Sequence, residues 1–426
     1  MRVLITGGTV LDTEPEPHVL PGADVLIDGE LIVAVEPGLR DDPRAEGAEV
    51  IDATGRIVLP GFVDTHRHVW QGLLRGTAAD ATLGEYLDRV LGCYGTAHRP
   101  DDVYAGSLWG ALDALDAGVT TQYDWSHIQL TPEHTDAAVA ALRDSGVRAV
   151  FGYAHPATAD PDRRESELRR LRAEHFPSAE PGLITPALAE WGGPETIEAD
   201  WRLARELGMH ISLHAVGQGP VEQLHAAGLL GPDLLFVHCN GFTDEALKLL
   251  ADSGGTASVS PAVELQVGLG TPETGRLRAH GIPTGLSVDT ITNVPGDLFS
   301  VMRAAFAAER ARNLAESGTG AAPEPIRAAE VLRMATIEGA AAIGLADRVG
   351  SLRPGKQADV ILLDAEALNI APVHDPVAAV VTTADRGNVD TVLVAGRVLK
   401  RSGRLLHADV TAARDAATRA AVHVTA

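Results

Sequence analysis

The chain has 426 residues, of which 45% are hydrophobic, and a formal net charge of −23. This length favours a large domain with a smaller one, and the acid excess argues against nucleic acid or an anionic membrane as a partner. No apolar run approaches the roughly 20 residues that span a bilayer. The N-terminal stretch does not resemble a signal peptide, because turn residues and acids interrupt it at once. The two cysteines, Cys93 and Cys239, are too few for a disulfide framework, so we expect a cytoplasmic protein.

Short apolar runs separated by glycine, aspartate and proline fill residues 1–57. This texture predicts small antiparallel strands, and it returns in residues 358–364 and 389–398. We therefore expect the two chain ends, residues 1–57 and 350–426, to pair into one small β-sandwich domain. Residues 409–420 have the pattern of a terminal helix.

Between these ends, apolar runs alternate with helical patterns in an α/β arrangement. The predicted strands are 58–65, 118–124, 147–153, 183–189, 209–214, 234–238, 256–260 and 284–289. The predicted helices include 101–117, 133–145, 195–207, 219–228 and 243–253. Eight strands alternating with helices are typical of a (β/α)8 TIM barrel, here over residues 58–349. A doubly wound sheet would instead need a glycine-rich phosphate loop after the first strand, and residues 63–66 do not form one. The best candidate for a flexible loop is 315–325.

Four histidines and one aspartate stand where predicted strands end. His66 and His68 are two residues apart, so they point to the same side of the first strand. His214 ends the fifth strand, His238 the sixth and Asp289 the eighth. The carboxyl ends of barrel strands meet at one face, and imidazoles with a carboxylate are typical zinc ligands. The sequence therefore predicts a metal site at this face.

Several motifs resemble those of the amidohydrolase superfamily, in its cytosine-deaminase and triazine-chlorohydrolase branch. They are GFVDTHRH at 61–68, GVTT at 118–121, SLH at 212–214, VHC at 237–239, GLSVD at 285–289 and GSLRPGKQAD at 350–359. The resemblance covers essentially the whole chain. It implies the barrel with its split sheet domain, a small-molecule substrate and a homodimer or higher homo-oligomer.

The resemblance also implies roles for the residues at the strand ends. His66, His68, His214 and Asp289 would bind one divalent metal, Zn²⁺ in the first place and Fe²⁺ as the alternative. Zinc lowers the pKa of a coordinated water to about 7. Asp289 would take that water's proton, and His238 would stabilise the charge that develops on the substrate.

A second metal is not expected. Binuclear members of the superfamily bridge their metals with a carboxylated lysine at the end of strand 4. The three lysines of this chain, Lys248, Lys356 and Lys400, all lie elsewhere. Only Glu190 is left for that role.

Gly217 is the main departure from the resemblance. Deaminases of this branch usually carry a glutamate three residues after the strand-5 histidine, and it moves a proton onto the ring nitrogen. Such acid–base assistance is typically worth about 10²–10⁴-fold, so another group supplies it here or the reaction does not need it. Glu264 and Glu190 are candidate substitutes, although for each of them the favoured interpretation is a surface or structural acid.

Other aromatic and polar residues stand just past strand ends and are candidates for substrate binding. They are Trp70, Gln71, Trp125, His127, His155, Glu190 and Trp191. Aromatic walls with a few polar groups suit a planar or cyclic organic ligand. The alternative is that the tryptophans pack loops against the barrel and that His127 and His155 are structural.

Three functions fit these observations. The first is a metal-dependent hydrolase that attacks a carbon–nitrogen bond of a small cyclic or heterocyclic compound, by deamination or cyclic-amide hydrolysis. Gly217 slightly favours cyclic-amide hydrolysis over deamination. The second is a lyase, cyclase or isomerase that uses the metal as a Lewis acid, since loss of the shuttle glutamate suits such a change. The third is a binding protein without catalysis.

Overall fold

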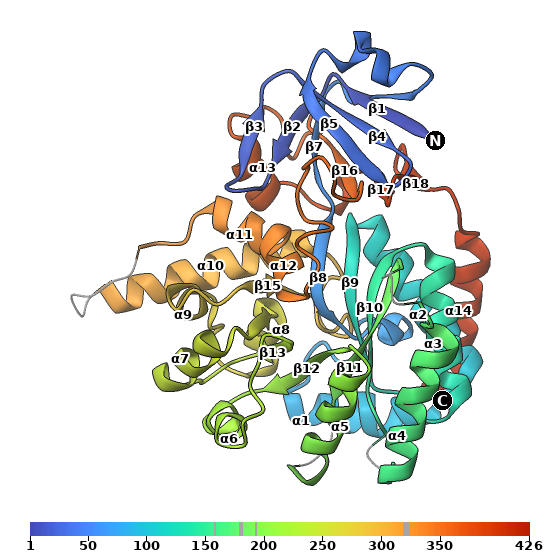
Figure 1. Ribbon diagram of the computed structural model, residues 1–426, viewed down its shortest axis with the longest axis vertical. Coiled ribbons are helices and arrows are strands. Elements are labelled where there is room, and N and C mark those ends of the chain that lie inside the picture. The colour runs from blue at the N-terminus through green and yellow to red at the C-terminus, as the bar shows by residue number, and fades with distance from the viewer. Residues whose placement is uncertain (157–158, 179–181, 192–193, 318–323) are drawn as a thin grey trace.

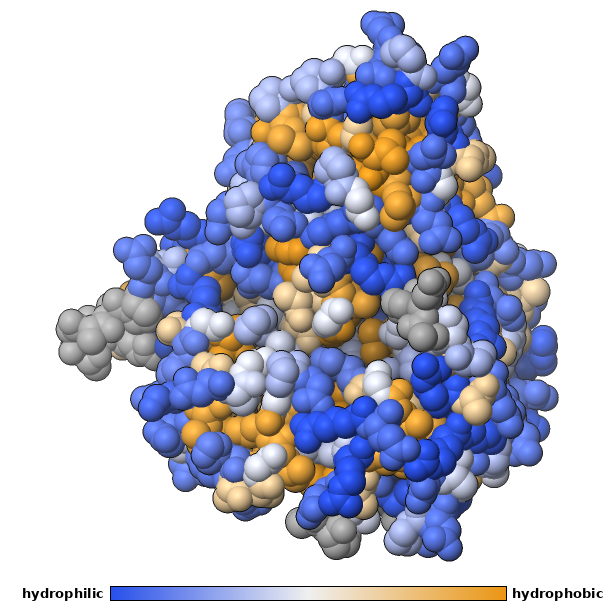
Figure 2. All heavy atoms as spheres, in the orientation of Figure 1, coloured by the Kyte–Doolittle hydropathy of each residue, from blue (hydrophilic) through white to orange (hydrophobic). Residues whose placement is uncertain are grey.

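The computed structural model describes residues 1–156, 159–178, 182–191, 194–317 and 324–426. They form a barrel beneath two smaller sheets (Figure 1). Of the predicted flexible segment 315–325, residues 318–323 lie outside the described residues. Hydrophilic side chains cover most of the face in Figure 2, and an apolar area lies over the sheets of the chain ends.

Eight parallel strands form the barrel, each hydrogen-bonded to its neighbour in chain order. They are β8 (Phe62–Arg67), β9 (Val119–Ser126), β10 (Arg148–Tyr153), β11 (Ile184–Glu190), β12 (His210–Ala215), β13 (Leu234–His238), β14 (Thr256–Val259) and β15 (Thr284–Leu286). A parallel bridge between Arg67 and Asp289 closes the ring. The predicted barrel is therefore confirmed.

Helices follow the strands around the barrel. They are α2 (Pro100–Asp116), α3 (Pro132–Ser145), α4 (Pro161–Arg170), α5 (Pro194–Glu206), α6 (Pro220–Ala226), α7 (Asp244–Ser253), α8 (Pro261–Val267), α9 (Thr274–Ala279), α10 (Leu298–Ser317), α11 (Ala328–Met334) and α12 (Ile337–Ala342). Many begin with proline, whose missing N–H costs nothing in the first turn of a helix. Among the described residues, no helix is long and apolar enough to cross a bilayer.

The barrel interior is filled by side chains. Val63, Tyr123, Val150 and Leu235 of four strands share one buried cluster with Ala340 of α12. This packing makes the barrel a solid core rather than a pore. The chemistry is therefore confined to the strand ends.

The bounds predicted for the first strand are wrong, because residues 58–65 belong to two strands. β7 (Arg56–Pro60) pairs with β16 (Val360–Asp364) in the upper sheet, and β8 starts the barrel. They part at Gly61, where an added Cβ would lie 2.2 Å from the Thr120 side chain. Both strands are buried on both faces, so the apolar run continues across the break.

The two smaller sheets are built from both chain ends, as predicted. A four-stranded sheet has the order β5–β4–β1–β6, and a seven-stranded sheet has the order β19–β18–β17–β16–β7–β2–β3. The remaining strands are β1 (Arg2–Thr6), β2 (Thr9–Asp12), β3 (His18–Leu20), β4 (Ala23–Asp28), β5 (Leu31–Pro37), β6 (Glu49–Asp52), β17 (Val389–Val394), β18 (Arg397–Arg401) and β19 (Arg404–Leu405). Val3, Val25, Val58 and Leu362 share one buried cluster, so the sheets pack face to face. The domain boundaries at 57/58 and 349/350 stay predictions.

The described residues form three further α-helices: α1 (Leu83–Tyr86), α13 (Pro376–Thr382) and α14 (Val410–Val424). α1 runs into a π-helical segment, Leu87–Gly95. The terminal helix α14 packs against α2 on the outside of the barrel (Figure 1). A buried ion pair also joins the two parts, since the Arg148 guanidinium donates to the Asp359 carboxylate at 2.9 Å.

Candidate metal centre and active site

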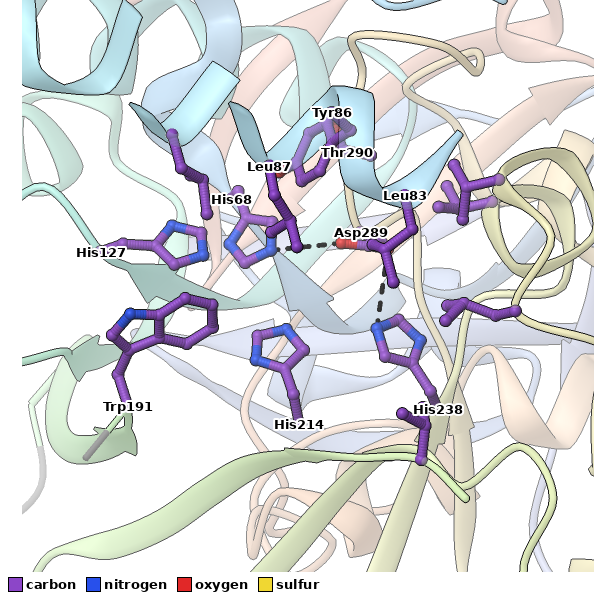
Figure 3. A pocket seen from close by; sticks show the side chains of 15 residues that line it. His68, Leu83, Tyr86, Leu87, His127, Trp191, His214, His238, Asp289 and Thr290 are labelled. Atoms are coloured by element: carbon purple, nitrogen blue, oxygen red, sulfur yellow. Dashed lines mark ion pairs between the residues drawn. The ribbon is translucent and has the colours of Figure 1, made fainter. Parts of the chain in front are cut away.

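The end of β8 brings two imidazoles to one carboxylate. The Nε2 atoms of His66 and His68 both lie 3.2 Å from Oδ1 of Asp289 (Figure 3 shows His68). The Asp289 backbone is fixed as well, because its N–H donates to His66 O and its C=O accepts from His68 N, each at 2.9 Å. The contact that closes the barrel therefore also sets this site.

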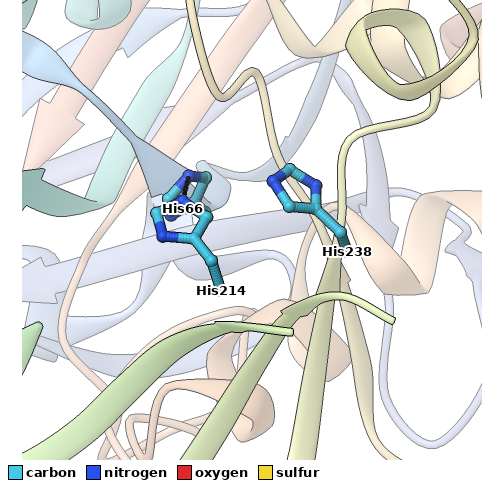
Figure 4. Close-up of side chains that lie close together, drawn as sticks. All are labelled: His66, His214 and His238. Carbon is cyan, nitrogen blue, oxygen red and sulfur yellow. Dashed lines mark hydrogen bonds between the residues drawn. The ribbon is translucent and has the colours of Figure 1, made fainter. Parts of the chain in front are cut away.

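Two more histidines complete the cluster. His214 on β12 places Nε2 at 3.3 Å from Nε2 of His66 (Figure 4). His238 ends β13, and its Nε2 lies 3.9 Å from Oδ2 of Asp289. His238 and Asp289 both have positive φ, at 77° and 63°. Non-glycine residues rarely adopt this conformation, and it clusters at functional sites.

The donor set fits a divalent metal. Nδ1 of His68 lies 2.8 Å from the Trp125 carbonyl oxygen, which can only accept, so this nitrogen carries the ring proton. In the neutral ring the Nε2 lone pair then faces the Asp289 carboxylate at 3.2 Å. Two acceptors at this distance repel each other unless a cation lies between them. A hydrogen bond from a ligand histidine to a backbone carbonyl is also a common way to orient a metal site.

The protonation states agree with a ligand role. Burial lowers the pKa of His66 to about 3 and holds that of His214 well below its usual value, so both rings are neutral. Burial alone would raise the pKa of Asp289. The adjacent His66 and His68 rings, each 3.2 Å from Oδ1, outweigh burial and hold that pKa well below its usual value. Three imidazoles and one carboxylate form a typical zinc ligand set.

Glu264 holds the His238 ring in place. Its Oε1 accepts from Ser260 N at 2.7 Å and lies 3.2 Å from Nδ1 of His238, while Nε2 of that ring faces Asp289. Burial lowers the pKa of His238, but Glu264 and Asp289 outweigh it and raise that pKa. Glu264 is fully buried on α8 and does not line the pocket.

A pocket of about 160 Å³ opens over the cluster (Figure 3). Its polar and aromatic lining consists of His68, His127, His214, His238, Asp289, Trp191, Tyr86 and Thr290. The rest of the lining is aliphatic. The metal cluster therefore opens into a mostly apolar cavity.

Of the candidate substrate-binding residues, His127 and Trp191 line this pocket and the others do not. Trp125 is fully buried and packs on His214, with ring centroids 4.2 Å apart. Gln71 lies behind the lining, where it donates to Tyr86 Oη at 2.6 Å and accepts from Thr290 Oγ1 at 2.5 Å.

Glu190 and His155 lie outside the lining as well. Glu190 accepts from Trp201 Nε1 at 2.9 Å and faces Arg164 at 3.5 Å. It is therefore committed to a buried network. His155 is buried beside Tyr153. Burial, together with the positive charge of the nearby Arg164, lowers the pKa of His155 to about 3, so its ring is neutral.

Trp70 sets the tautomer of His127. The indole Nε1–H of the fully buried Trp70 donates to Nδ1 of His127 at 3.2 Å, so the neutral His127 ring carries its proton on Nε2. The His127 ring stacks on His68, with centroids 4.0 Å apart. His127 therefore presents an N–H donor at the pocket beside a metal ligand.

The aliphatic lining was missed from the sequence. Leu83, Leu87 and Leu91 come from α1 and the π-helical segment, and Val263 and Val267 come from α8. The three leucines are spaced by four residues, which places them on one helical face. That spacing is the sequence pattern from which an apolar helical face could have been predicted.

Comparison with known proteins agrees with this geometry. The model of the amidohydrolase family matches residues 57–399. The chain belongs to the amidohydrolase family. A 5-methylthioadenosine/S-adenosylhomocysteine deaminase of Symbiobacterium thermophilum is 32% identical to this amidohydrolase, over 93% of each chain.

Solved structures show the same likeness. A zinc-bound adenosine deaminase of Xanthomonas campestris has a TM-score of 0.86 at 26% identity, over 99% of this chain and 98% of that one. A zinc complex of atrazine chlorohydrolase from Arthrobacter aurescens has a TM-score of 0.88 at 25% identity, over 98% and 100%. The predicted family, fold and enzyme class are confirmed: this amidohydrolase is a metal-dependent hydrolase acting on carbon–nitrogen bonds.

Proposed function

We propose that this amidohydrolase binds one zinc ion and removes an amino group from a small heterocycle by hydrolysis. His66, His68, His214 and Asp289 would hold the ion. The observation that carries this proposal is their convergence at one end of a pocket, within hydrogen-bond distances of one another. The names of the deaminase relatives support the reaction.

A bound zinc ion supplies Lewis acidity and lowers the pKa of water at the site. The residues of the chain do the rest. The ionised Asp289 carboxylate takes the proton of the attacking water. His238, held by Glu264 with Nε2 toward Asp289, donates a hydrogen bond to the substrate atom that gains negative charge.

His127 fills part of the gap left at Gly217. A glycine cannot donate a proton to a ring nitrogen, and Glu190 and Glu264 both lie outside the pocket lining. The Nε2–H of His127, fixed by Trp70, donates a hydrogen bond to the ring nitrogen in this scheme. Asp289 returns the proton taken from water to the amino group, which leaves as ammonia while the oxygen of water stays on the ring carbon. Glu264 is a positioning residue in this scheme, rather than the shuttle considered from the sequence.

A second candidate is hydrolysis of a cyclic amide. Gly217 favours it, because an amide carbonyl needs no proton on a ring nitrogen. In that reaction Asp289 takes the proton of water and returns it to the leaving nitrogen.

The test is a screen of zinc-loaded protein on amino-substituted heterocycles and cyclic amides, with ammonia and product mass measured together. Ammonia release with exchange of the amino group for oxygen supports deamination. Gain of water without ammonia supports the amide, and a product of unchanged mass supports the lyase or isomerase alternative. A protein that binds no zinc and turns nothing over would contradict the proposal and leave a binding role.

We also propose a cytoplasmic location and a homodimer. Cys93 is exposed and Cys239 is buried, and both are free thiols, which suits a reducing compartment. The dimer rests on the family resemblance. Light scattering behind a sizing column tests it, and a monomer at micromolar concentration would contradict it.

A further inference from the structure

One wall of the pocket is a row of leucines. Leu83, Leu87 and Leu91 come from consecutive helical turns, and Leu83 and Leu87 lie over the metal cluster in Figure 3. Leu87 is 37% exposed although it lines a cavity. An apolar side chain left in water at a cavity wall gains free energy when a ligand covers it.

A second part of the lining is apolar as well. It consists of Val263 and Val267 on α8 and Leu269 just after that helix. At the mouth, Val216 is 42% exposed and Trp191 is 38% exposed. Apolar surface therefore continues from the cavity to its rim.

The polar groups of the lining belong to the metal cluster, His127, Tyr86, Thr290 and the Trp191 indole. Among the described residues that line the pocket, none is arginine, lysine, asparagine, glutamine or serine. The Thr290 hydroxyl donates to Gln71, and the Tyr86 hydroxyl accepts from Gln71. A sugar bound against the aliphatic lining would bury hydroxyls without partners, and each such group weakens binding by a factor of about 5 to 150.

We propose that the substrate is an uncharged ring carrying an apolar substituent, which the leucine row and α8 bind while the ring faces the metal. A ribosyl or charged substituent is rejected. The proposal rests on the proposed function only in placing the reacting ring at the metal end. It separates this chain from relatives whose names denote nucleosides.

The test measures binding rather than turnover, so its outcome does not depend on the reaction. Zinc-loaded protein is titrated by calorimetry with 2-alkylpyrimidines from ethyl to hexyl, which carry no leaving group. Matched probes end in a hydroxyl, and adenosine serves as the sugar-bearing probe. Each added methylene is expected to tighten binding about fourfold until the cavity is filled, and the hydroxyl is expected to cancel the gain.

A dissociation constant that does not fall with chain length would overturn the proposal, as would adenosine binding tighter than the butyl probe. If chain length matters but no heterocycle is turned over, the apolar site stands and the proposed reaction fails. If a nucleoside is deaminated and binds best, the reaction stands and the apolar site fails.

Variants of the leucine row test whether it causes the dependence of binding on chain length. Leu87→Ser and Leu91→Ser should each weaken the hexyl probe several-fold and leave the ethyl probe nearly unchanged. Leu368→Ser is the matched control, since Leu368 is fully exposed and lies outside the pocket. Leu87 is partly exposed, so this variant keeps the test usable if Leu91→Ser does not fold. Unchanged chain-length dependence in both wall variants would contradict the assignment.

Discussion

Glu264 provides a sharp test of how His238 is held. In Glu264→Ala, the Ser260 N–H and Nδ1–H of His238 lose the oxygen that accepts from them at 2.7 and 3.2 Å. Both groups are buried, and each buried donor left unpaired costs about 1–3 kcal/mol. The expected loss in the free energy of unfolding is therefore roughly 2–6 kcal/mol. Glu264→Gln keeps an acceptor oxygen in the same place and should recover most of it.

Urea unfolding followed by tryptophan fluorescence measures this loss, and zinc content and turnover are measured on the same samples. We expect Glu264→Gln to keep its zinc and a turnover within about tenfold of wild type, because a positioning role needs the hydrogen bonds and not a titrating proton. Glu264→Ala should lose more of both stability and turnover. The reasoning fails if Glu264→Gln is as inactive as Glu264→Ala, which would restore the shuttle role. It also fails if Glu264→Ala unfolds at the wild-type urea concentration.

Three further changes are predicted. Asp289→Ala or His66→Ala should remove most of the bound zinc without unfolding the chain, as shown by elemental analysis beside circular dichroism; full zinc content in either variant would refute the ligand assignment. Gly217→Glu should fold, because no atom lies within 4 Å of an added Cβ. The φ of 78° should cost about 1 kcal/mol of stability, and the variant should change the pH–rate profile. An insoluble variant would show that a side chain cannot be accommodated at this position. Burial raises the pKa of Asp124 to about 7 from 3.8. Between these pH values the folded state keeps a proton that the unfolded state releases. The free energy of unfolding of the wild type should therefore fall by roughly 4 kcal/mol as the pH rises from 4 through 7. Asp124→Asn removes this loss, so its advantage in urea should grow from pH 5 to pH 8, and an equal difference at both pH values would count against the raised pKa.

The sequence predicted the metal cluster because two simple rules determine it. Residues two apart share one side of a strand, and barrel strands end at one face. His66, His68 and His214 needed nothing more. The rules say where along a strand a residue lies but not how deep its side chain packs. Trp70 and Trp125 were therefore predicted as pocket walls, whereas the structure buries both beneath the imidazoles.

The missing parts have physical reasons as well. The leucine row does not follow a strand end, and its helical segment changes to π-helical geometry after Tyr86. The break between β7 and β8 was hidden because burial on both faces makes the two strands equally apolar. The pairing that separates them depends on β16, far away in the sequence, and no local pattern contains it.

The junction at Gly61 has a consequence for synthesis. β7 continues directly into the strand that carries the first two ligands, and its Pro60 pairs with Val360, which is made 300 residues later. A growing chain folds from its N-terminus as it emerges, so β7 lacks this neighbour until most of the protein exists. We expect the ligand pair on β8 to reach its final position only then. We expect that a ribosomal product that stops before β16 would carry every proposed metal ligand and still fail to retain the ion, so that only finished chains would be loaded with metal.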